Sequence, residues 1–336
     1  MHRDARKTSE ETIMPFPDPS EYKVFKIPKK HGGHRQIEAP NAQLKAKQRK
    51  LLQDMKGLHY ISPFVHSFRS NHNVVTNAKG HVGAKYVLHI DASNFFPSIT
   101  YNNFRWRVNQ YKLYETTEGW QTWMDRFQLC FCKFPGDTEE RLPQGAPTSP
   151  WISNVYLSKF DTVMARYMTY MDVNISKGSP TEVSKYNYSR YADDITISGP
   201  DEKRLWAIYF MMEKRLLKRY GITLNRRKTR MMGPSRRKVV CGIVVNEKTQ
   251  PKRRWRKNLR AEVFNKLISK GVPKDKIKEV LNQIKEGKPI DKAYAKYLDN
   301  AALGRSSYLS MCRKTEGYGS SESIFISRHS DVLSNL

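Results

Sequence analysis

Cysteine is scarce in this sequence, with four residues among 336. So few cysteines in a chain of this length do not form a disulfide scaffold. Cys130 and Cys132 stand two positions apart, but no second pair of metal ligands lies near them in the sequence, which argues against a zinc site. We therefore expect the cysteines to be small buried residues of a reduced, cytoplasmic protein.

Long apolar runs are also missing. No stretch approaches the ~20 apolar residues that a membrane-spanning helix needs. Residues 1–20 are polar and charged and lack the apolar centre of an export signal. Hydrophobic residues still make up 38% of the chain and aromatic residues 11%, which is enough for a folded core. These features predict a folded protein without a membrane partner.

Acidic residues are few relative to basic ones. Lys and Arg number 60 against 32 Asp and Glu, which gives a formal net charge of +28. Such an excess resists compaction unless an anion neutralises it, and nucleic acid is the usual polyanion. The imbalance is concentrated in residues 226–266, which contain fifteen Lys or Arg and two acids. A membrane surface would instead favour a basic helix with a strongly apolar face, which is not evident. We expect a nucleic-acid partner.

Apolar periodicity predicts an α+β fold. Alternating residues over 22–27 and 35–38 indicate a hairpin with a basic, glycine-bearing tip. Further strands are expected over 85–90, 188–191, 195–198 and 238–245. Helices are expected over 44–58, within 71–84, and over 102–111, 121–132, 149–171 and 203–220, the last ended by Gly221. Residues 254–303 indicate a bundle of basic helices.

Two adjacent carboxylates, Asp193 and Asp194, join two of these expected strands. Adjacent Asp residues are common in exposed turns, so the pair alone indicates a turn more often than a site. Their flanking residues, Tyr191 and Ile195, do not favour turns. Two carboxylates at the tip of a buried hairpin are unfavourable unless a cation compensates them, and Mg²⁺ prefers such oxygen ligands.

Asp91 is the second candidate metal ligand, because it ends the apolar strand 86–90. It could equally be the N-cap of a helix. With Asp193 it would form a two-metal site. One ion would lower the pKa of an attacking hydroxyl, and the other would stabilise a leaving pyrophosphate.

The segment Tyr191-Ala192-Asp193-Asp194 resembles the catalytic box of reverse transcriptases. Four other segments resemble that family in the same order: 91–96, 142–150, 221–229 and 239–245, the last similar to the primer-grip hairpin. The resemblance implies a right-hand polymerase with fingers, a palm with an antiparallel sheet, and a helical thumb. The implied parts are a lead-in at 1–21, fingers at 22–84, a palm with interleaved fingers elements at 85–245, a basic thumb at 246–305 and a polar tail at 306–336.

The resemblance also implies roles for particular residues. Asp91, Asp193 and Asp194 would bind two Mg²⁺ ions, for which Mn²⁺ could substitute in vitro, and the backbone carbonyl of Ala92 would assist. Lys228 would donate a proton to pyrophosphate, or would simply contact the nucleic-acid backbone. The residues implied to bind the deoxynucleoside triphosphate are Arg35 with Lys29 or Lys30, Gln144, Gly145, and Phe96.

Phe96 would exclude a 2′-hydroxyl by steric clash, although it or Phe95 could instead be a core aromatic. The thumb residues implied to bind nucleic acid are Arg253, Arg254, Arg256, Lys257 and Arg260.

Asn77-Ala78-Lys79-Gly80-His81 matches the Asn-Ala-x-x-His element of bacterial retron reverse transcriptases. Val240-Cys241-Gly242 stands where retrons carry Val-Thr-Gly, so this second marker is met only in part. Membership of that group implies a structured non-coding RNA as partner, its partial copy into single-stranded DNA with a 2′–5′ branch, and an effector protein in antiphage defence. Asn77 and His81 could read this RNA, or they could instead be a structural hydrogen-bonding pair.

No segment resembles an RNase H, a maturase extension or a His-Asn-His nuclease, which argues against retroviral and full-length intron-encoded enzymes. Two alternatives remain open: a bacterial defence reverse transcriptase outside the retrons, and a catalytically silent RNA-binding scaffold. The three acids argue against the scaffold, because a basic scaffold has no need of them.

Overall fold

The computed structural model describes residues 15–29, 32–55, 61–109, 117–175, 186–286, 288, 290–299, 302, 306–309 and 311–312. Its chain divides into two compact units. The first unit contains Met1–Phe68, Ile90–Arg166 and Trp206–Lys228, and the second contains Arg69–His89, Tyr167–Leu205 and Thr229–Leu336. Helices alternate with antiparallel strands, so the predicted α+β class is confirmed. Both units contain part of the predicted palm, and the division into fingers, palm and thumb stays a prediction.

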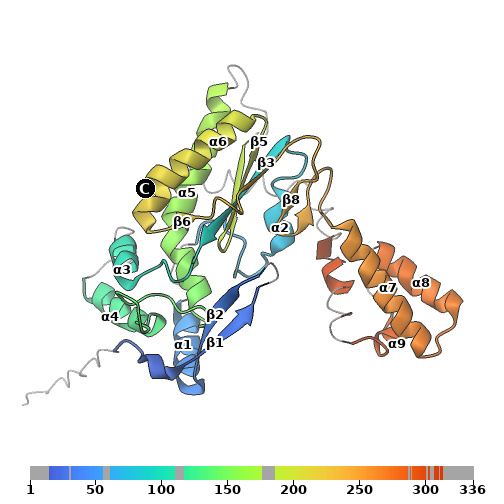
Figure 1. The fold of residues 1–336 in the computed structure, drawn as a ribbon, viewed down its shortest axis with the longest axis horizontal. Helices are drawn as coiled ribbons and strands as arrows, with labels where there is room; N and C mark the ends of the chain where they lie inside the picture. The colour runs from blue at the N-terminus through green and yellow to red at the C-terminus, as the bar shows by residue number, and fades with distance from the viewer. Residues whose placement is uncertain are drawn as a thin grey trace, which may run out of the picture. The chain divides into compact units, whose positions relative to one another are not determined.

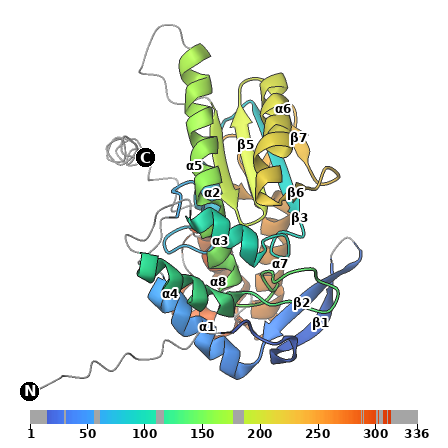
Figure 2. The same cartoon turned by 90° about the vertical axis from the view of Figure 1, so that its left-hand side faces the viewer.

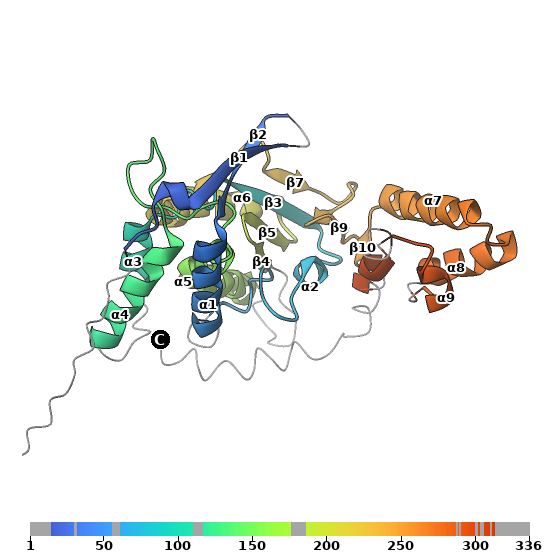
Figure 3. The same ribbon diagram turned by 90° about the horizontal axis from the view of Figure 1, so that it is seen from below.

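In the first unit, β1 (Tyr22–Pro28) and β2 (His34–Pro40) form the predicted hairpin. Its tip contains Gly32 and Gly33, whose φ angles of 89° and 76° suit glycine. Figure 3 shows the two strands as an extended ribbon. Most of β1 is exposed on both faces, including Val24, Phe25 and Ile27.

Helices complete the first unit. The helix α1 (Ala42–Met55) lies beside α4 (Thr117–Phe127), and Arg126 pairs with Asp54 between them (Figure 2). The helix α3 (Tyr101–Asn109) supplies Phe104 to an aromatic cluster with Phe127 and Phe131. The helix α5 (Ser149–Ile175) begins here and runs on into the second unit.

The helix α6 (Glu202–Met211) continues through a π turn (Met212–Leu216) and a 3-10 turn (Leu217–Tyr220). It ends at Gly221, whose φ of 65° confirms the predicted cap.

Strand β3 (Tyr86–Ser93) passes from the second unit into the first. In the second unit its first half pairs with β7 (Arg230–Met232). In the first unit its second half pairs with β6 (Thr223–Leu224). The second unit also contains α2 (Val74–Lys79) and the predicted hairpin of β4 (Asn187–Tyr191) and β5 (Asp194–Gly199).

The prediction of one continuous strand over 238–245 was wrong. The segment folds back as β8 (Val239–Val240) and β9 (Ile243–Val244), and β9 also pairs with β10 (Gln250–Pro251). Cys241 and Gly242 form the turn, with φ angles of 45° and 87°. Two consecutive positive φ angles match the tight turn that the twist of a hairpin favours.

The helices α7 (Arg253–Ser269), α8 (Lys274–Glu286) and α9 (Lys292–Ala295) pack together in the second unit (Figure 1). Their core includes Leu259, Val263 and Val280, and Leu309 is buried in it. Cys312 is buried in another core with Val240 and Ile243. The predicted polar tail from 306 therefore begins within a packed segment.

None of the four cysteines forms a disulfide, and Cys130, Cys132 and Cys312 are buried, as expected, whereas Cys241 is only half-buried. Within the described ranges, none of the helices is long and apolar enough to cross a membrane.

Candidate active site

Asp91 lies in β3 among residues that are fully buried, including Leu88 and Ile90. Its own side chain is nearly buried. The prediction that Asp91 ends the strand was wrong. Strand β3 extends two residues further, and these residues, Ala92 and Ser93, pair with Leu224 and Thr223 of β6. A position inside a strand also excludes the helix N-cap alternative. The strand thus holds this carboxylate rigidly at the surface of the core.

Lys228 is the residue that contacts this carboxylate. Its Nζ lies 3.1 Å from both Oδ1 and Oδ2 of Asp91. The turn after β6 positions the lysine: the Asn225 amide donates to the Asp91 carbonyl at 2.7 Å, and the Lys228 amide donates to the Asn225 carbonyl at 3.1 Å. The Lys228 side chain is 61% exposed, so it can leave the carboxylate without unfolding anything. Asp91 therefore presents both of its oxygens to a cation.

Asp193 and Asp194 lie at the tip of the β4–β5 hairpin, and both are half-buried. The turn needs a left-handed residue, and Ala192 adopts a φ of 56°. Arg190, which is fully buried, donates from Nη1 to the Ala192 carbonyl at 3.1 Å. This bond stabilises the strained turn from within the core, since a hydrogen bond from a charged donor is a strong one.

Two side chains of the second unit approach Asp194. His89 Nε2 lies 3.6 Å from its Oδ1, and Cys241 Sγ lies 4.0 Å from its Oδ2. Burial raises the pKa of the Cys241 thiol, and the negative charges of Asp194 and Asp193 raise it further. The thiol is therefore protonated and adds no negative charge beside the carboxylates.

The donor set fits a hard divalent cation. Carboxylates are preferred Mg²⁺ ligands, and Asp91 already holds a cationic group on both oxygens. Among the residues that the structure describes, no three His, Cys, Asp or Glu side chains converge closely enough to hold an ion by themselves. Asp91 belongs to the first unit, and Asp193 and Asp194 belong to the second. A metal site shared by all three is thus a proposal and not an observed cluster.

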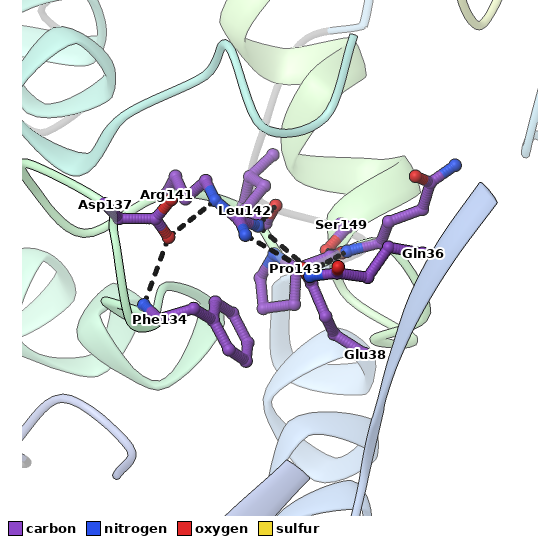
Figure 4. A network of polar contacts seen from close by, with 9 residues as sticks. Gln36, Glu38, Phe134, Asp137, Arg141, Leu142, Pro143 and Ser149 are labelled. Atoms are coloured by element: carbon purple, nitrogen blue, oxygen red, sulfur yellow. Dashed lines mark hydrogen bonds and ion pairs between the residues drawn. The ribbon is translucent and has the colours of Figure 1, made fainter. Parts of the chain in front are cut away.

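A buried ion pair connects β2 to the segment 142–147 in the first unit (Figure 4). Arg141 donates from Nη1 and Nη2 to the two carboxylate oxygens of Glu38, at 2.9 and 2.8 Å. Its Nε also lies 2.7 Å from Asp137 Oδ2. Glu38 Oε2 accepts from the Gln144 amide at 2.8 Å, and the Glu38 amide donates to the Gln144 carbonyl at 2.9 Å. Gln144 is therefore held against the strand that carries Arg35.

Gly145 makes the closest backbone approach in this region. A Cβ atom there would lie 2.9 Å from the Glu38 carbonyl oxygen, and its φ is 144°. Only glycine fits this position, because both the space and the backbone conformation exclude a side chain.

We expect Gly145→Ala to destabilise the protein by about 1–3 kcal/mol and to raise the KM for dNTP, because segment 142–147 must shift away from β2. Denaturation curves and steady-state kinetics would measure this. Gly136→Ala is the matched control, since Gly136 has a φ of 90° but no atom lies within 4 Å of where its Cβ would be. Equal losses in the two variants would show that the close approach to Glu38 is unimportant.

The remaining predicted nucleotide-binding residues also lie in the first unit. Arg35 and Lys29 are exposed on the β1–β2 hairpin, while Lys30 lies outside the described residues. Phe95 is buried and Phe96 is half-buried, with ring centroids 5.3 Å apart. Phe95 is thus the core aromatic, and Phe96 keeps an accessible surface.

The five predicted basic residues of the thumb lie on α7, in the second unit. Arg253, Arg254 and Lys257 are exposed, whereas Arg256 and Arg260 are half-buried. The opposite face of the helix buries Leu259, Val263 and Leu267 in the bundle core. The exposed cations are available to phosphates.

A protein-family model described as "Reverse transcriptase (RNA-dependent DNA polymerase)" matches residues 27–270 and so covers most of the chain, including all three aspartates. The chain belongs to the reverse transcriptase family. This match agrees with the observed mixture of helices and antiparallel strands, as the right-hand α+β polymerase fold requires.

Curated relatives of this reverse transcriptase are retron enzymes. The retron Mx65 reverse transcriptase of Myxococcus xanthus is 31% identical over 258 residues, which cover 75% of this chain and 57% of that protein. The retron Ec86 reverse transcriptase of Escherichia coli is 29% identical over 248 residues, covering 73% and 69%. The reverse transcriptase described here is thus of the bacterial retron type, and it spans little more than half of the Mx65 enzyme.

Solved structures of telomerases are also similar to this reverse transcriptase. Telomerase from Candida albicans, in complex with the TWJ fragment of telomeric RNA, matches with a TM-score of 0.46 and 12% identity. That match covers 75% of this chain and 51% of the telomerase. An apo telomerase from Candida tropicalis, truncated of its C-terminal domain, matches with a TM-score of 0.45 and 15% identity, covering 71% and 56%.

Sequence reasoning missed several residues that shape this reverse transcriptase. Glu38 and Arg141 were not singled out, although Glu38 occupies an inward position of an alternating strand, which is a signal for a paired buried charge. Arg190 and His89 were missed as well. Their flanking sequences carry no mark of the contacts that they make.

Proposed function

We propose that this reverse transcriptase is the RNA-directed DNA polymerase of a retron, which copies part of a structured non-coding RNA into single-stranded DNA. The observation that carries the proposal is Asp193-Asp194 at the tip of a hairpin with buried strands, within a chain whose relatives are retron enzymes. The net charge of +28 supports a polyanionic partner.

Asp91, Asp193 and Asp194 would hold two Mg²⁺ ions, assisted by the Ala92 carbonyl. The ions would activate the primer hydroxyl and stabilise the leaving pyrophosphate. The protein's own contribution is rigidity: β3 fixes Asp91, and Arg190 fixes the turn that carries the other two carboxylates.

The incoming dNTP would lie against the first unit. Arg35, with Lys29 or Lys30, would bind its triphosphate, and the Arg fork suits two phosphate oxygens. Gln144 and Gly145 would line the pocket, held by the Glu38–Arg141 pair. The accessible ring of Phe96 would exclude a 2′-hydroxyl and so select deoxynucleotides.

Lys228 would donate the proton to pyrophosphate. We expect Lys228→Met to lower kcat for dNTP incorporation about 100-fold or more, because general acid catalysis contributes about 10²–10⁴-fold. Arg227→Met, in the same exposed turn, is the control and should keep kcat. A Lys228→Met enzyme with full kcat and only a raised KM for primer–template would instead make Lys228 a backbone contact.

The RNA partner would be bound in part by Arg253, Arg254, Arg256, Lys257 and Arg260, which would contact phosphates and 2′-hydroxyls. The product would be a branched RNA–DNA molecule with a 2′–5′ linkage, and the complex would act with an effector protein in antiphage defence. Sequencing of the nucleic acid that copurifies with the protein tests this proposal. One defined RNA linked to its DNA copy is expected, whereas homopolymeric or random DNA attached to protein would refute a retron.

The second candidate is a bacterial defence reverse transcriptase outside the retrons. The observation that favours it is Cys241, which stands in place of the retron threonine and lies 4.0 Å from Asp194. The sequencing experiment separates the two. A silent RNA-binding scaffold is a third candidate, and it predicts RNA binding without Mg²⁺-dependent dNTP incorporation.

A further inference from the structure

Three residues of the element Asn77-Ala78-Lys79-Gly80-His81 are buried. Asn77 and His81 are each 1% exposed, and Ala78 is fully buried. The short helix α2 begins with Asn73, whose side chain accepts from the Val75 and Thr76 amides. His81 then follows the helix end, where its amide donates to the Ala78 carbonyl at 3.1 Å. A nucleic acid on the protein surface has no access to these buried side chains.

His81 instead contacts both strands of the β4–β5 hairpin. Its Nδ1 lies 2.7 Å from Ser198 Oγ, and its Nε2 lies 2.8 Å from Ser189 Oγ. Burial lowers the pKa of His81 to about 3, so the ring is neutral. A neutral imidazole carries one N–H, and therefore one serine accepts from the ring and the other donates to it. Both ring nitrogens are satisfied inside the core.

The two serines share a face with a catalytic carboxylate. Side chains alternate along a strand, and Ser189 pairs with Thr196 while Tyr191 pairs with Asp194. Ser189, Ser198 and Asp194 consequently lie on the same face of the hairpin. Ser198 is four residues from Asp194, roughly 13 Å along β5, and Ser189 is two residues from Tyr191, the partner of Asp194, roughly 7 Å along β4.

A second contact from the same element reaches the tip. Asn77 Nδ2 donates to Cys241 Sγ at 3.4 Å, and Cys241 Sγ lies 4.0 Å from Asp194 Oδ2. Asn77 thus contacts Cys241, which lies near the tip of the hairpin, and His81 contacts the two strands of the hairpin. Each connects the α2 element to the hairpin that carries the aspartates.

We propose that His81 is a positioning residue, which clamps the two strands of the β4–β5 hairpin and thereby holds Asp193 and Asp194 where the metal ions bind. The inference rests on the proposed polymerase function. It assigns the Asn77–His81 element to the geometry of the carboxylates and not to recognition of RNA.

The test replaces His81 by phenylalanine, which fills the same space but cannot bond to either serine. We expect kcat on a preformed primer–template to fall between about 10-fold and about 100-fold, because small displacements of reacting groups have effects of that size. The KM for dNTP and the affinity for RNA should be unchanged, while the half-saturating Mg²⁺ concentration rises. Amide hydrogen exchange over 187–199 should become faster.

Thr196→Val is the matched control. Among the described residues, Thr196 Oγ1 has no hydrogen-bond partner, although it lies on the same face of the hairpin as the serines. Its loss should leave kcat and hydrogen exchange as in the wild type. Ser198→Ala is a milder substitution that removes only one of the two contacts of His81, and it serves if His81→Phe folds poorly. It should change kcat and the half-saturating Mg²⁺ concentration in the same direction as His81→Phe.

Two results would overturn the clamp: folded His81→Phe and Ser198→Ala with wild-type kcat and hydrogen exchange, or His81→Phe with normal kcat but weakened RNA binding. An inactive wild type would overturn the polymerase proposal instead. Hydrogen exchange would still decide the clamp in that case, because it does not depend on activity.

Discussion

The double substitution Asp193→Asn and Asp194→Asn is expected to abolish Mg²⁺-dependent dNTP incorporation. Amides keep the shape of the hairpin tip but lose the negative charge that binds metal ions. Metal ions supply several kcal/mol of transition-state stabilisation, and each ~1.4 kcal/mol is tenfold in rate, so a loss of at least about 1,000-fold is expected. Primer extension at varied Mg²⁺ would measure it.

RNA binding by this variant should be retained, because the basic residues of α7 are untouched. Glu247→Gln with Asp275→Asn is the matched control: it removes two charges at exposed positions and should leave incorporation intact. Adding Asp91→Asn to the double variant should cause little further loss, since residues that act as one unit are not additive. Wild-type-like synthesis by the double variant would defeat the assignment of the active site.

Of the substitutions proposed for this protein, Glu38→Ala should cause the largest loss of stability. Glu38→Ala leaves the guanidinium of Arg141 buried with only Asp137 to compensate it. Breaking one side of a buried ion pair costs about 3–5 kcal/mol. The KM for dNTP should rise as well, because the Glu38 carboxylate holds the Gln144 amide. Chemical denaturation would give the first quantity, and steady-state kinetics the second.

An exposed ion pair provides the comparison. Arg226 makes two hydrogen bonds to the carboxylate of Glu213, but its side chain is 72% exposed. Arg226→Ala should therefore destabilise the protein far less than Glu38→Ala, because water screens an exposed ion pair. Replacing Glu38 and Arg141 together by leucine should cost less than the sum of the single changes. Equal costs for Glu38→Ala and Arg226→Ala would show that burial adds nothing.

The same buried pair predicts a pH dependence of stability. Burial by itself raises the pKa of Glu38, but the hydrogen bonds from Arg141 and the Gln144 amide outweigh it, so the folded pKa lies below the ordinary 4.5. A lowered carboxyl pKa adds stability that is fully present above the unfolded value and is lost as the pH falls through the folded value. Wild-type stability should thus decline below about pH 4.5 more steeply than that of Glu38→Ala.

Local patterns predicted many elements of the fold. Alternation predicted β1, β2, β4 and β5, and apolar periodicity predicted α5, α7 and α8, because these patterns are consequences of strand and helix geometry. The segment 238–245 was predicted as one strand because the residues that follow Lys238 are all apolar apart from Gly242. An apolar run conceals the positive φ angles of Cys241 and Gly242, which only the pairing of β8 with β9 requires.

The sequence by itself determined the family and the identity of the candidate chemical groups, because the carboxylate blocks are contiguous in the chain. Only the tertiary structure decided what holds those groups. Glu38 and Arg141 are 103 residues apart, and His81 is 108 and 117 residues from its two serines. A buried polar group must find a partner wherever the fold supplies one, and that partner is not set by neighbours in the sequence.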